Sequence, residues 1–281
     1  MTRKAKLCRA MNRKFPLQKH PFNLANDGIM SYAEWQYEKG IDTIQFYLDF
    51  TDAKGLFEQK TVVDIGCGAS GKTLYYASFG VEHIYGVEVL GKYKEEAAAL
   101  AAKLNLAHVF SFVEADAAAL PFDDNSIDTI IMNDAMEHVD EPELVLAECM
   151  RVLKKGGRLY VNFPPYHHPF GAHLSDALGM PWVHLFFGDQ TLLEVYKDAV
   201  SHLPDGDERI AFRIATTEDG REYFSYINKM TIRRFQRILK SAGLTPVYYR
   251  EVPLRNALTP LAKLPLAKEM FVKMVVCVLE K

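Results

Sequence analysis

A chain of 281 residues is long enough for one large α/β domain, or for a domain with a substantial insertion. Hydrophobic residues make up 49% and charged residues 25%, and the net charge of -3 argues against a chain-wide attraction to nucleic acid. The sequence has no apolar run long enough to span a membrane and no signal-peptide core at its start, so we expect a cytoplasmic protein.

The four cysteines are widely separated and form no C-x-x-C pair. This spacing argues against a disulfide framework and against a structural zinc site. We therefore expect reduced and mostly buried thiols at Cys8, Cys67, Cys149 and Cys277.

The first twenty residues are basic, and the first acidic residue is Asp27. Two interpretations are open: a solvated, partly disordered terminus, or an arm that folds over an acidic or phosphorylated substrate. We assign residues 1–55 to a basic arm and helices that cover the site. The basic side chains are Arg3, Lys4, Lys6, Arg9, Arg13, Lys14 and Lys19.

Short apolar segments alternate with helical patterns from Thr61 onward. Segments rich in β-branched and aromatic residues and bounded by turn residues predict strands, whereas stretches rich in Ala, Glu and Lys predict helices. In chain order we predict a strand at Thr61–Ile65, a helix at Gly71–Phe79, a strand at His83–Val89, a helix at Lys92–Leu104, and strands at Val109–Glu114 and Ile127–Met132.

The next helix begins at Glu141-Pro142, because proline suits the first turn of a helix. The pair Gly156-Gly157 is expected to end this helix, and Arg158–Phe163 is the next predicted strand. The repeated β-α alternation predicts an α/β fold with a doubly wound, mostly parallel sheet covered by helices on both faces. We assign residues 56–164 to this core.

The alternation stops after Phe163, and the following residues are rich in aromatic side chains, histidines and helix breakers. This segment is too apolar to be disordered, so we interpret residues 165–229 as a substrate cap inserted into the fold. Residues 230–281 are expected to complete the sheet, with a helix at Thr231–Ala242 and strands at Val247–Val252 and Phe271–Leu279.

The loop after the first strand fits two kinds of site. Residues 66–73 satisfy the phosphate-binding pattern G-x-x-x-x-G-K-[ST], and Asp134 at the end of "TIIMND" suits the acid that holds magnesium in such an enzyme. The stretch Asp64-Ile-Gly66-Cys-Gly68 also forms the glycine turn of a nucleoside-binding fold. Both kinds of site lie between a strand and a helix N-terminus, so the loop alone does not decide between them.

Acidic residues at the ends of the first three strands favour the nucleoside site. Glu88 ends the second strand, where a doubly wound fold places a carboxylate on both ribose hydroxyls. Asp116 follows the third strand and can accept a hydrogen bond from an adenine amino group. Together with Asp64 these carboxylates suit a cationic ligand, whereas they would repel a triphosphate.

Several consecutive motifs resemble those of class I S-adenosylmethionine-dependent methyltransferases. The motifs are "VVDIGCG", "IYGVEV", "VEADAAALPFDDNSIDTIIMNDAMEHVDEP" and "ECMRVLKKGGRLYVNFP", and the resemblance is strongest to the small-molecule branch that makes ubiquinone and menaquinone. It covers Thr61 to Pro164 closely and the C-terminal segments more loosely. The resemblance implies a seven-stranded sheet whose last strand is antiparallel, with S-adenosylmethionine as cofactor and S-adenosylhomocysteine as product.

The resemblance also assigns roles to individual residues. Lys72 and Thr73 become ordinary helix residues, although Ser70-Gly71-Lys72-Thr73 departs from the family pattern and leaves the path of the loop open. Independently of the resemblance, we expect Glu137 and His138 in "AMEHV" to cap and space the following helix, with a functional role as the open alternative. By position, Gly66 and Gly68 admit the methionine part, Asp64 orients its amino group, Glu88 holds the ribose, Asp116 and Ala117 face adenine, and Asn133 lies beneath the methionine moiety.

Methyl transfer needs alignment, exclusion of water and sometimes a base, because the cofactor supplies the reactivity. A histidine can deprotonate an oxygen or amine nucleophile near neutral pH. Within the expected cap we favour His168 or His173 as the base, with His167 in reserve and Tyr166 as a further catalytic candidate. Structural roles for these residues stay open, and we expect no metal, because the spacing of His168, His173 and Asp176 matches no compact ligand motif.

These inferences predict a methyltransferase acting on a small-molecule acceptor, preferentially at oxygen, with no nucleic acid as partner. Carbon or nitrogen methylation of an aromatic or prenyl- or phosphate-bearing substrate is the nearest alternative, motivated by the aromatic cap and the basic arm. A P-loop nucleotide hydrolase is an alternative of another class, and a cofactor-binding protein without catalysis is a third.

Overall fold

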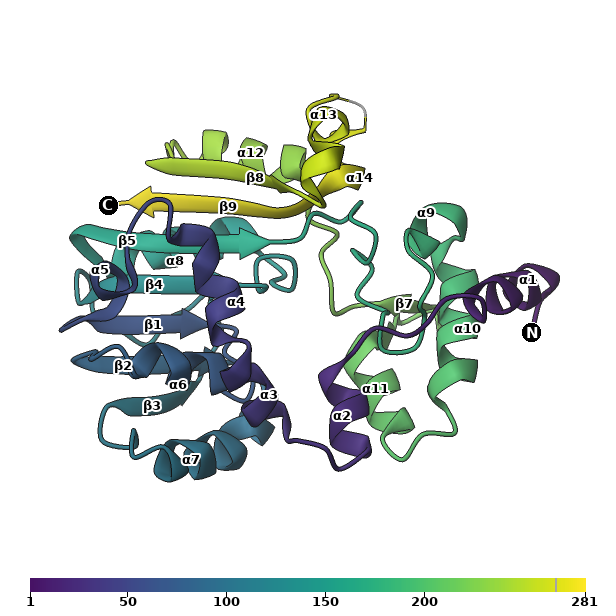
Figure 1. Ribbon diagram of the computed structural model, residues 1–281, viewed down its shortest axis with the longest axis horizontal. Helices are drawn as coiled ribbons and strands as arrows, with labels where there is room; N and C mark the ends of the chain where they lie inside the picture. Colours follow the sequence, from purple (N-terminus) through teal and green to yellow (C-terminus); the bar gives the residue numbers. More distant parts are fainter. Residues whose placement is uncertain (266) are drawn as a thin grey trace. The chain divides into compact units, whose positions relative to one another are not determined.

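The computed structural model describes residues 1–265 and 267–281, which form two compact units; Figure 1 labels most of their helices and strands. We call the larger one the sheet unit, and it comprises Met30–Phe163, Arg233–Val252 and Met274–Lys281. The helical unit comprises Met1–Ile29, Pro164–Ile232 and Pro253–Lys273. These units differ from the four consecutive segments expected above, because segments far apart in the sequence pack together in each unit.

The sheet unit is built on one seven-stranded sheet with the order β3-β2-β1-β4-β5-β9-β8. The chain reverses its direction of winding at β1, which lies between β2 and β4, so the sheet is doubly wound as predicted. The strands are β1 Thr61–Ile65, β2 His83–Glu88, β3 Phe110–Glu114, β4 Ile127–Asn133, β5 Leu153–Phe163, β8 Tyr248–Pro253 and β9 Val272–Glu280.

Strands β1 to β5 pair in parallel, whereas β9 pairs antiparallel with β5, so that Phe163 faces Val275 and Arg158 faces Glu280. This confirms the predicted α/β fold class and the antiparallel last strand. The carboxyl ends of β1, β2, β3 and β4 consequently meet at one edge of the sheet, which we call the carboxyl edge.

The fifth strand is the largest difference from the predicted elements of the core. Helix α8 (Pro142–Val152) ends before the glycine pair, and β5 begins at Leu153, ahead of the predicted Arg158. Gly156 adopts a φ of +79°, and the register between β4 and β5 shifts between Ile127 and Thr129. The glycines therefore form an irregularity within the strand and do not end the helix.

Buried apolar residues of the strands and surrounding helices form the core of the sheet unit. Helices α3, α4, α6 and α7 contact one another, and α8 contacts β5. The helical elements are α3 Tyr32–Glu38, α4 Gly40–Ile44, η1 Gln45–Tyr47, α5 Ala53–Phe57, α6 Gly71–Ala77, η2 Gly91–Tyr93, α7 Lys94–Lys103, α8 and α12 Ile232–Ser241.

The helical unit has its own core, centred on α10. The sequence analysis predicted none of its inner elements, although the buried residues Leu192, Leu193, Val195, Tyr196 and Val200 of α10 have the spacing of an amphipathic helix. Its elements are α1 Arg3–Asn12, α2 Pro21–Asn26, α9 Val183–Phe186, α10 Asp189–Val200, α11 Gly206–Arg213, β6 Ile214–Thr216, β7 Glu222–Phe224, η3 Asn256–Leu258, α13 Thr259–Ala262 and α14 Lys268–Phe271.

The N-terminal segment contains a packed helix, so the interpretation of a solvated, partly disordered terminus is wrong for Arg3–Asn12. Thr2 caps α1 by accepting a hydrogen bond from the amide of Ala5, and α1 contacts α10. Ala5 and Cys8, three positions apart, are fully buried, so the basic residues lie on the remaining, exposed faces. All four cysteines are free thiols and buried, as expected.

A buried charge cluster holds distant segments of the helical unit together. Asp176 forms ion pairs with Arg209 and Arg213, each with an N–O distance of 3.2 Å, and these three side chains are at most 3% exposed. The side chain of Asn23 donates to the carbonyl of Asp176 and accepts from Arg209. Throughout the described residues, helices that combine the length and the apolarity needed for a membrane crossing are absent.

Candidate cofactor and catalytic sites

The turn between β1 and α6 requires glycine at two positions. Gly66 and Gly68 have φ values of +73° and +55°, which L side chains rarely adopt. A Cβ on Gly66 would lie 2.7 Å from the Cβ of Ala135, in the loop after β4. The turn therefore brings the backbone after β1 close to the loop after β4, at the carboxyl edge.

The amide groups of this turn donate to protein acceptors. A phosphate cradle instead directs such amides toward the bound anion. The amides of Gly66 and Cys67 donate to the carbonyl of Val87, that of Gly68 to Glu88 Oε2, that of Ser70 to the carbonyl of Cys67 and that of Gly71 to Gln36 Oε1. This geometry argues against a P-loop.

Asp64 lies beneath the turn with its carboxylate turned toward α6. It is 4% exposed, and its Oδ2 accepts a hydrogen bond of 2.6 Å from Thr73 Oγ1. Burial raises the pKa of Asp64 to about 7, while the Thr73 hydrogen bond and the charge of Lys72 oppose the shift. Thr73 is thus bonded to Asp64, which removes the hydroxyl that a P-loop offers to magnesium.

Glu88 lies at the end of β2, as predicted, and both of its carboxylate oxygens accept backbone hydrogen bonds. Oε2 accepts from the amide of Gly68 at 3.0 Å and Oε1 from the amide of Leu90 at 3.1 Å. Asp116, after β3, is exposed and forms a turn in which its Oδ1 accepts from the amide of Ala118. Ala117 is half-buried within that turn. The structure therefore places these predicted residues along the same edge as the glycine turn.

Asn133 ends β4, and its side chain is held in a buried hydrogen-bond network. Its Oδ1 accepts from Tyr47 Oη at 2.7 Å and from Asn162 Nδ2 at 2.6 Å, while its Nδ2 donates to Tyr76 Oη at 3.0 Å. The side chain thus fixes the end of β4 against neighbouring elements. Its predicted place beneath the methionine moiety stays a prediction.

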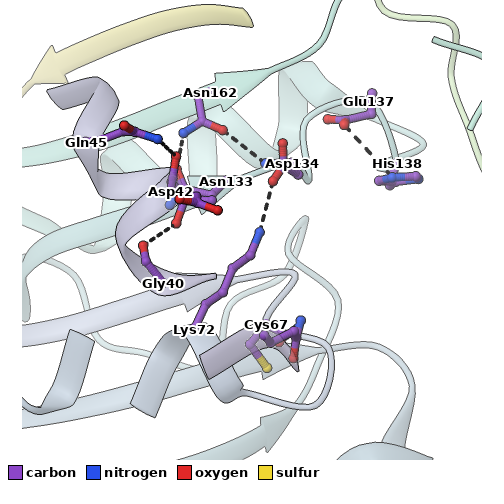
Figure 2. Close-up of polar contacts among 12 residues, drawn as sticks. Gly40, Asp42, Gln45, Cys67, Lys72, Asn133, Asp134, Glu137, His138 and Asn162 are labelled. Atoms are coloured by element: carbon purple, nitrogen blue, oxygen red, sulfur yellow. Dashed lines mark hydrogen bonds and ion pairs between the residues drawn. The ribbon is translucent and has the colours of Figure 1, made fainter. Parts of the chain in front are cut away.

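Lys72 and Asp134 form an ion pair at the carboxyl edge, which Figure 2 shows together with the neighbouring polar groups. Lys72 Nζ lies 2.9 Å from Asp134 Oδ2, and the Lys72 side chain is only 16% exposed. Asp134 has a φ of +52°, and its amide donates to the carbonyl of Asn162. Lys72 is thus more than an ordinary helix residue, because it joins the loops after β1 and β4.

Glu137 and His138 follow in the same loop. Glu137 is 3% exposed, and burial together with the charge of Asp134 raises its pKa well above its usual value. His138 Nε2 lies 4.0 Å from Glu137 Oε1. The expectation that these residues cap α8 is wrong, because the N-cap of α8 is Glu141, which makes no side-chain capping bond.

The other predicted catalytic residues lie in the helical unit. His167 Nδ1 is 3.0 Å from Glu269 Oε2, in α14. The ring of Tyr166 packs against the rings of His167 and His184, with centroid distances of 5.6 and 4.9 Å, and Lys229 Nζ lies 5.6 Å from its centroid. These side chains form one polar and aromatic cluster.

His168 is less suited to proton transfer than His167, and His173 is positioned by a contact of its backbone. His168 Nδ1 accepts a hydrogen bond from the amide of Phe170 at 3.2 Å, and burial lowers the pKa of His168 to about 4. His173 has a φ of +51°, and its carbonyl accepts from Arg213 Nε. His173 therefore contributes to the buried charge cluster through its backbone.

Sequence patterns missed the contribution of α3 to the cofactor edge. Gln36 holds both sides of the glycine turn, since it donates to the carbonyl of Cys67 and accepts from the amide of Gly71. The hydroxyl of Tyr32 lies within 3.2 Å of the position that a Cβ on Gly68 would occupy. The capping box of Ser31 and Glu34 was a readable signal for α3, but it says nothing of these contacts.

Comparison with known proteins agrees with this geometry. Residues 63–161 match a family model described as a methyltransferase domain. A solved S-adenosylmethionine-dependent methyltransferase from Aquifex aeolicus is 16% identical, with a TM-score of 0.50 over 93% of this chain and 99% of that one. At this identity the structural likeness shows the fold alone.

Three curated relatives match the chain over part of its length. They are a chloroplastic tocopherol O-methyltransferase of Arabidopsis thaliana (38% identical, 40% of this chain and 32% of the relative), a demethylmenaquinone methyltransferase of Renibacterium salmoninarum (32%, 45% and 53%) and a sterol 24-C-methyltransferase of Aspergillus fumigatus (29%, 50% and 40%). The chain thus spans between about a third and a half of their lengths. The match of residues 63–161 to a methyltransferase domain agrees with the resemblance to S-adenosylmethionine-dependent methyltransferases that the motifs of this segment carry.

Proposed function

We propose that this protein transfers the methyl group of S-adenosylmethionine to an oxygen atom of a small-molecule metabolite. The observation that carries the proposal is the contact between the glycine turn and Glu88, in which the amide of Gly68 donates to Glu88 Oε2 at 3.0 Å. In this contact, a backbone segment that a ligand can approach closely lies next to a carboxylate that suits ribose hydroxyls. The residues present therefore fit an adenosyl cofactor.

The remaining groups of the carboxyl edge support the same cofactor. Carboxylates of Glu88 and Asp116 favour a ligand that carries an ammonium and a sulfonium over a triphosphate. When bound, the cofactor supplies an activated methyl group on a sulfonium sulfur. The protein then needs to orient the acceptor, exclude water and receive the proton that the acceptor loses.

Among the candidate bases, the contacts favour His167. With the proton on Nδ1 directed at Glu269, the lone pair of Nε2 can receive a proton from an acceptor hydroxyl. His168 instead uses its Nδ1 lone pair for the amide of Phe170. We therefore propose His167 as the base and Glu269 as the residue that positions it, with Tyr166, His168 and His173 in supporting roles.

The choice of oxygen over carbon rests on this base. The relatives include a tocopherol O-methyltransferase and a sterol 24-C-methyltransferase, so the comparisons leave both oxygen and carbon open as the methylated atom. A carbon acceptor such as an alkene gives a cationic intermediate, which aromatic side chains can stabilise. An oxygen acceptor needs a proton acceptor such as the one that Glu269 orients.

A transfer assay with methyl-labelled S-adenosylmethionine and a panel of phenols, alcohols, amines and prenyl compounds tests the proposal. We expect a labelled ether product, and we expect His167→Ala to lower its rate roughly 10²- to 10⁴-fold, the usual contribution of a general base. His202→Ala, at an exposed position of the same unit, is the matched control and should retain the rate. A labelled carbon product, or equal rates for both variants, would contradict the assignment of oxygen and of the base.

A further inference from the structure

The basic side chains of the N-terminal segment have no role in the proposed function. They precede Asp27, the first acidic residue of the chain, and every one of them is exposed. One of them, Arg9, forms an ion pair with Asp198 at an N–O distance of 2.9 Å. Within the part of the chain that the structure describes, the others have no such partner; they are Arg3, Lys4, Lys6, Arg13, Lys14 and Lys19.

Helix α1 holds this segment in place, because its buried face packs on α10 (Figure 1). At its end, Asn12 Oδ1 accepts a hydrogen bond of 3.0 Å from the amide of Met180. The chain after the helix is also closely packed, since a Cβ on Gly179 would overlap the carbonyl oxygen of Pro16. The basic side chains therefore extend from a folded element that faces solvent on its other side.

The outward face of α1 combines cations with an apolar side chain. An α-helix repeats every 3.6 residues, so Arg3, Lys6 and Leu7 lie opposite the buried stripe of α1. Arg13 and Lys14 continue this face in the turn that ends the helix, where the amide of Lys14 donates to the carbonyl of Met11. We call this face, together with residues 15–19, the basic surface.

Apolar side chains are interleaved with the cations of the basic surface. Leu7 is 56% exposed, and Phe15 and Leu17 are 39% and 52% exposed. At a bilayer, such side chains can leave water for the acyl region beneath the headgroups while neighbouring cations contact lipid phosphates. Leucine side chains offer no ring on which a nucleic-acid base can stack. The combination therefore fits a bilayer better than a nucleic acid.

The acidic side chains that face α1 from α10 are already engaged. Glu194 accepts hydrogen bonds from the amide and the hydroxyl of Thr2, at 2.6 and 2.8 Å, and Asp198 pairs with Arg9. The cations of the outward face consequently keep their charge, and clusters of roughly four to eight Lys and Arg residues bind anionic lipids. We propose that the basic surface docks on a bilayer that carries anionic lipid headgroups.

Flotation with lipid vesicles tests the proposal. We expect the protein to float with vesicles of phosphatidylcholine and phosphatidylglycerol, to stay in solution with phosphatidylcholine alone, and to be released by high salt, which screens the attraction. Replacing Lys6, Arg13 and Lys14 together by Gln should lower the partition coefficient about 100-fold, because each cation near the surface contributes a factor of about five. The unfolding midpoint in urea should not change, since these side chains are exposed.

A triple variant of the sheet unit supplies the matched control. Replacing Lys155, Arg237 and Lys240 by Gln removes the same number of lysines and arginines from exposed positions. This variant should float with the anionic vesicles as the unaltered protein does. An equal loss in both triple variants, or failure of the unaltered protein to float with the anionic vesicles, would overturn the proposal.

A polarity-sensitive dye tests whether the apolar side chains enter the bilayer. The four native thiols are buried, so Leu7→Cys supplies an accessible thiol for the dye, and Leu144→Cys, at a 49% exposed position of the sheet unit, is the control. With anionic vesicles we expect the emission to shift to shorter wavelength at position 7 only. Equal emission at both positions, or tighter binding to single-stranded RNA than to the vesicles, would contradict docking on a bilayer.

Discussion

Asp64, which the sequence predicted to bind the cofactor, also lowers the stability of the folded protein when its buried carboxyl group ionises. From the sequence alone, Asp64 was a candidate cofactor-binding residue because it lies near the end of a buried strand, before a glycine turn. The structure adds that it is nearly inaccessible and that Thr73 donates to it. That hydrogen bond, between residues on either side of the glycine turn, follows from the path of the loop, which the sequence left open.

Asp64 is expected to make stability fall as the pH rises. Burial raises the pKa of Asp64 to about 7 in the folded protein, whereas an unfolded aspartate titrates near 3.9. A raised pKa means that the folded state binds more protons between these values, so the contribution is complete below about pH 4 and is lost as the pH rises through about 7. The unaltered protein should therefore lose free energy of unfolding, on the order of a few kcal/mol, as the pH rises from about 4 to 7. We predict that Asp64→Asn removes this loss.

Urea unfolding at pH 5 and pH 8 measures this effect. Glu137, whose pKa is also raised, contributes with the same sign in both proteins, so the relevant quantity is the difference between the variant and the unaltered protein. Asp116→Asn, at an exposed position, serves as the control. An equal slope of stability against pH in Asp64→Asn and the unaltered protein would show that Asp64 does not carry the effect.

Among the helices and strands, the bounds of the first strands of the sheet were predicted most accurately. The bounds of the helices that precede the sheet in the chain were not predicted. Strand β1 was predicted at its observed bounds and β2 to within one residue, because β-branched runs between turn residues mark buried strands. Helices were expected within residues 1–55, but the bounds of α3 and its contacts with the glycine turn were not predicted, since these contacts join residues more than thirty positions apart. Gln36 binds both ends of the glycine turn, which no local pattern around either segment indicates.

The packing of α3 on the glycine loop predicts a strong effect at Gly71. A Cβ there would lie 1.9 Å from the carbonyl oxygen of Ala33 and 2.6 Å from the amide nitrogen of Tyr37, both backbone atoms of α3. Gly71→Ala should therefore push α3 away and destabilise the protein by roughly 1–3 kcal/mol. We expect S-adenosylhomocysteine binding to weaken as well, because Gln36 would lose its hold on the turn.

Gly188→Ala is the matched control for this variant. Gly188 has an ordinary φ of -71°, and a Cβ there would meet no atom within 4 Å. We expect its unfolding midpoint in urea to stay close to that of the unaltered protein. If Gly71→Ala unfolded at the same urea concentration as Gly188→Ala, the close packing of α3 on the loop would be disproved.

At the scale of the whole molecule, the sequence predicted the sheet and missed the helical unit. The alternation of strands and helices implied a doubly wound sheet, and the resemblance implied its antiparallel last strand, which pairs with β5. The helical unit combines three separate chain segments, and its charge cluster joins Asn23 to Asp176 and Arg209. Contacts between such distant segments leave no local pattern in the sequence. The packing of the helix in the basic N-terminal segment was therefore not predicted.

The most direct test of the central claim is calorimetric titration of the unaltered protein with S-adenosylhomocysteine and, separately, with ATP and magnesium. We expect the glycine turn to accept an adenosyl cofactor and no triphosphate, because its amides already donate to Val87, Glu88, Cys67 and Gln36. We predict micromolar binding of S-adenosylhomocysteine, its loss in Glu88→Ala, and no binding of ATP. Binding of ATP with magnesium in place of S-adenosylhomocysteine would mean that residues 66–73 form a phosphate cradle, and it would contradict the account.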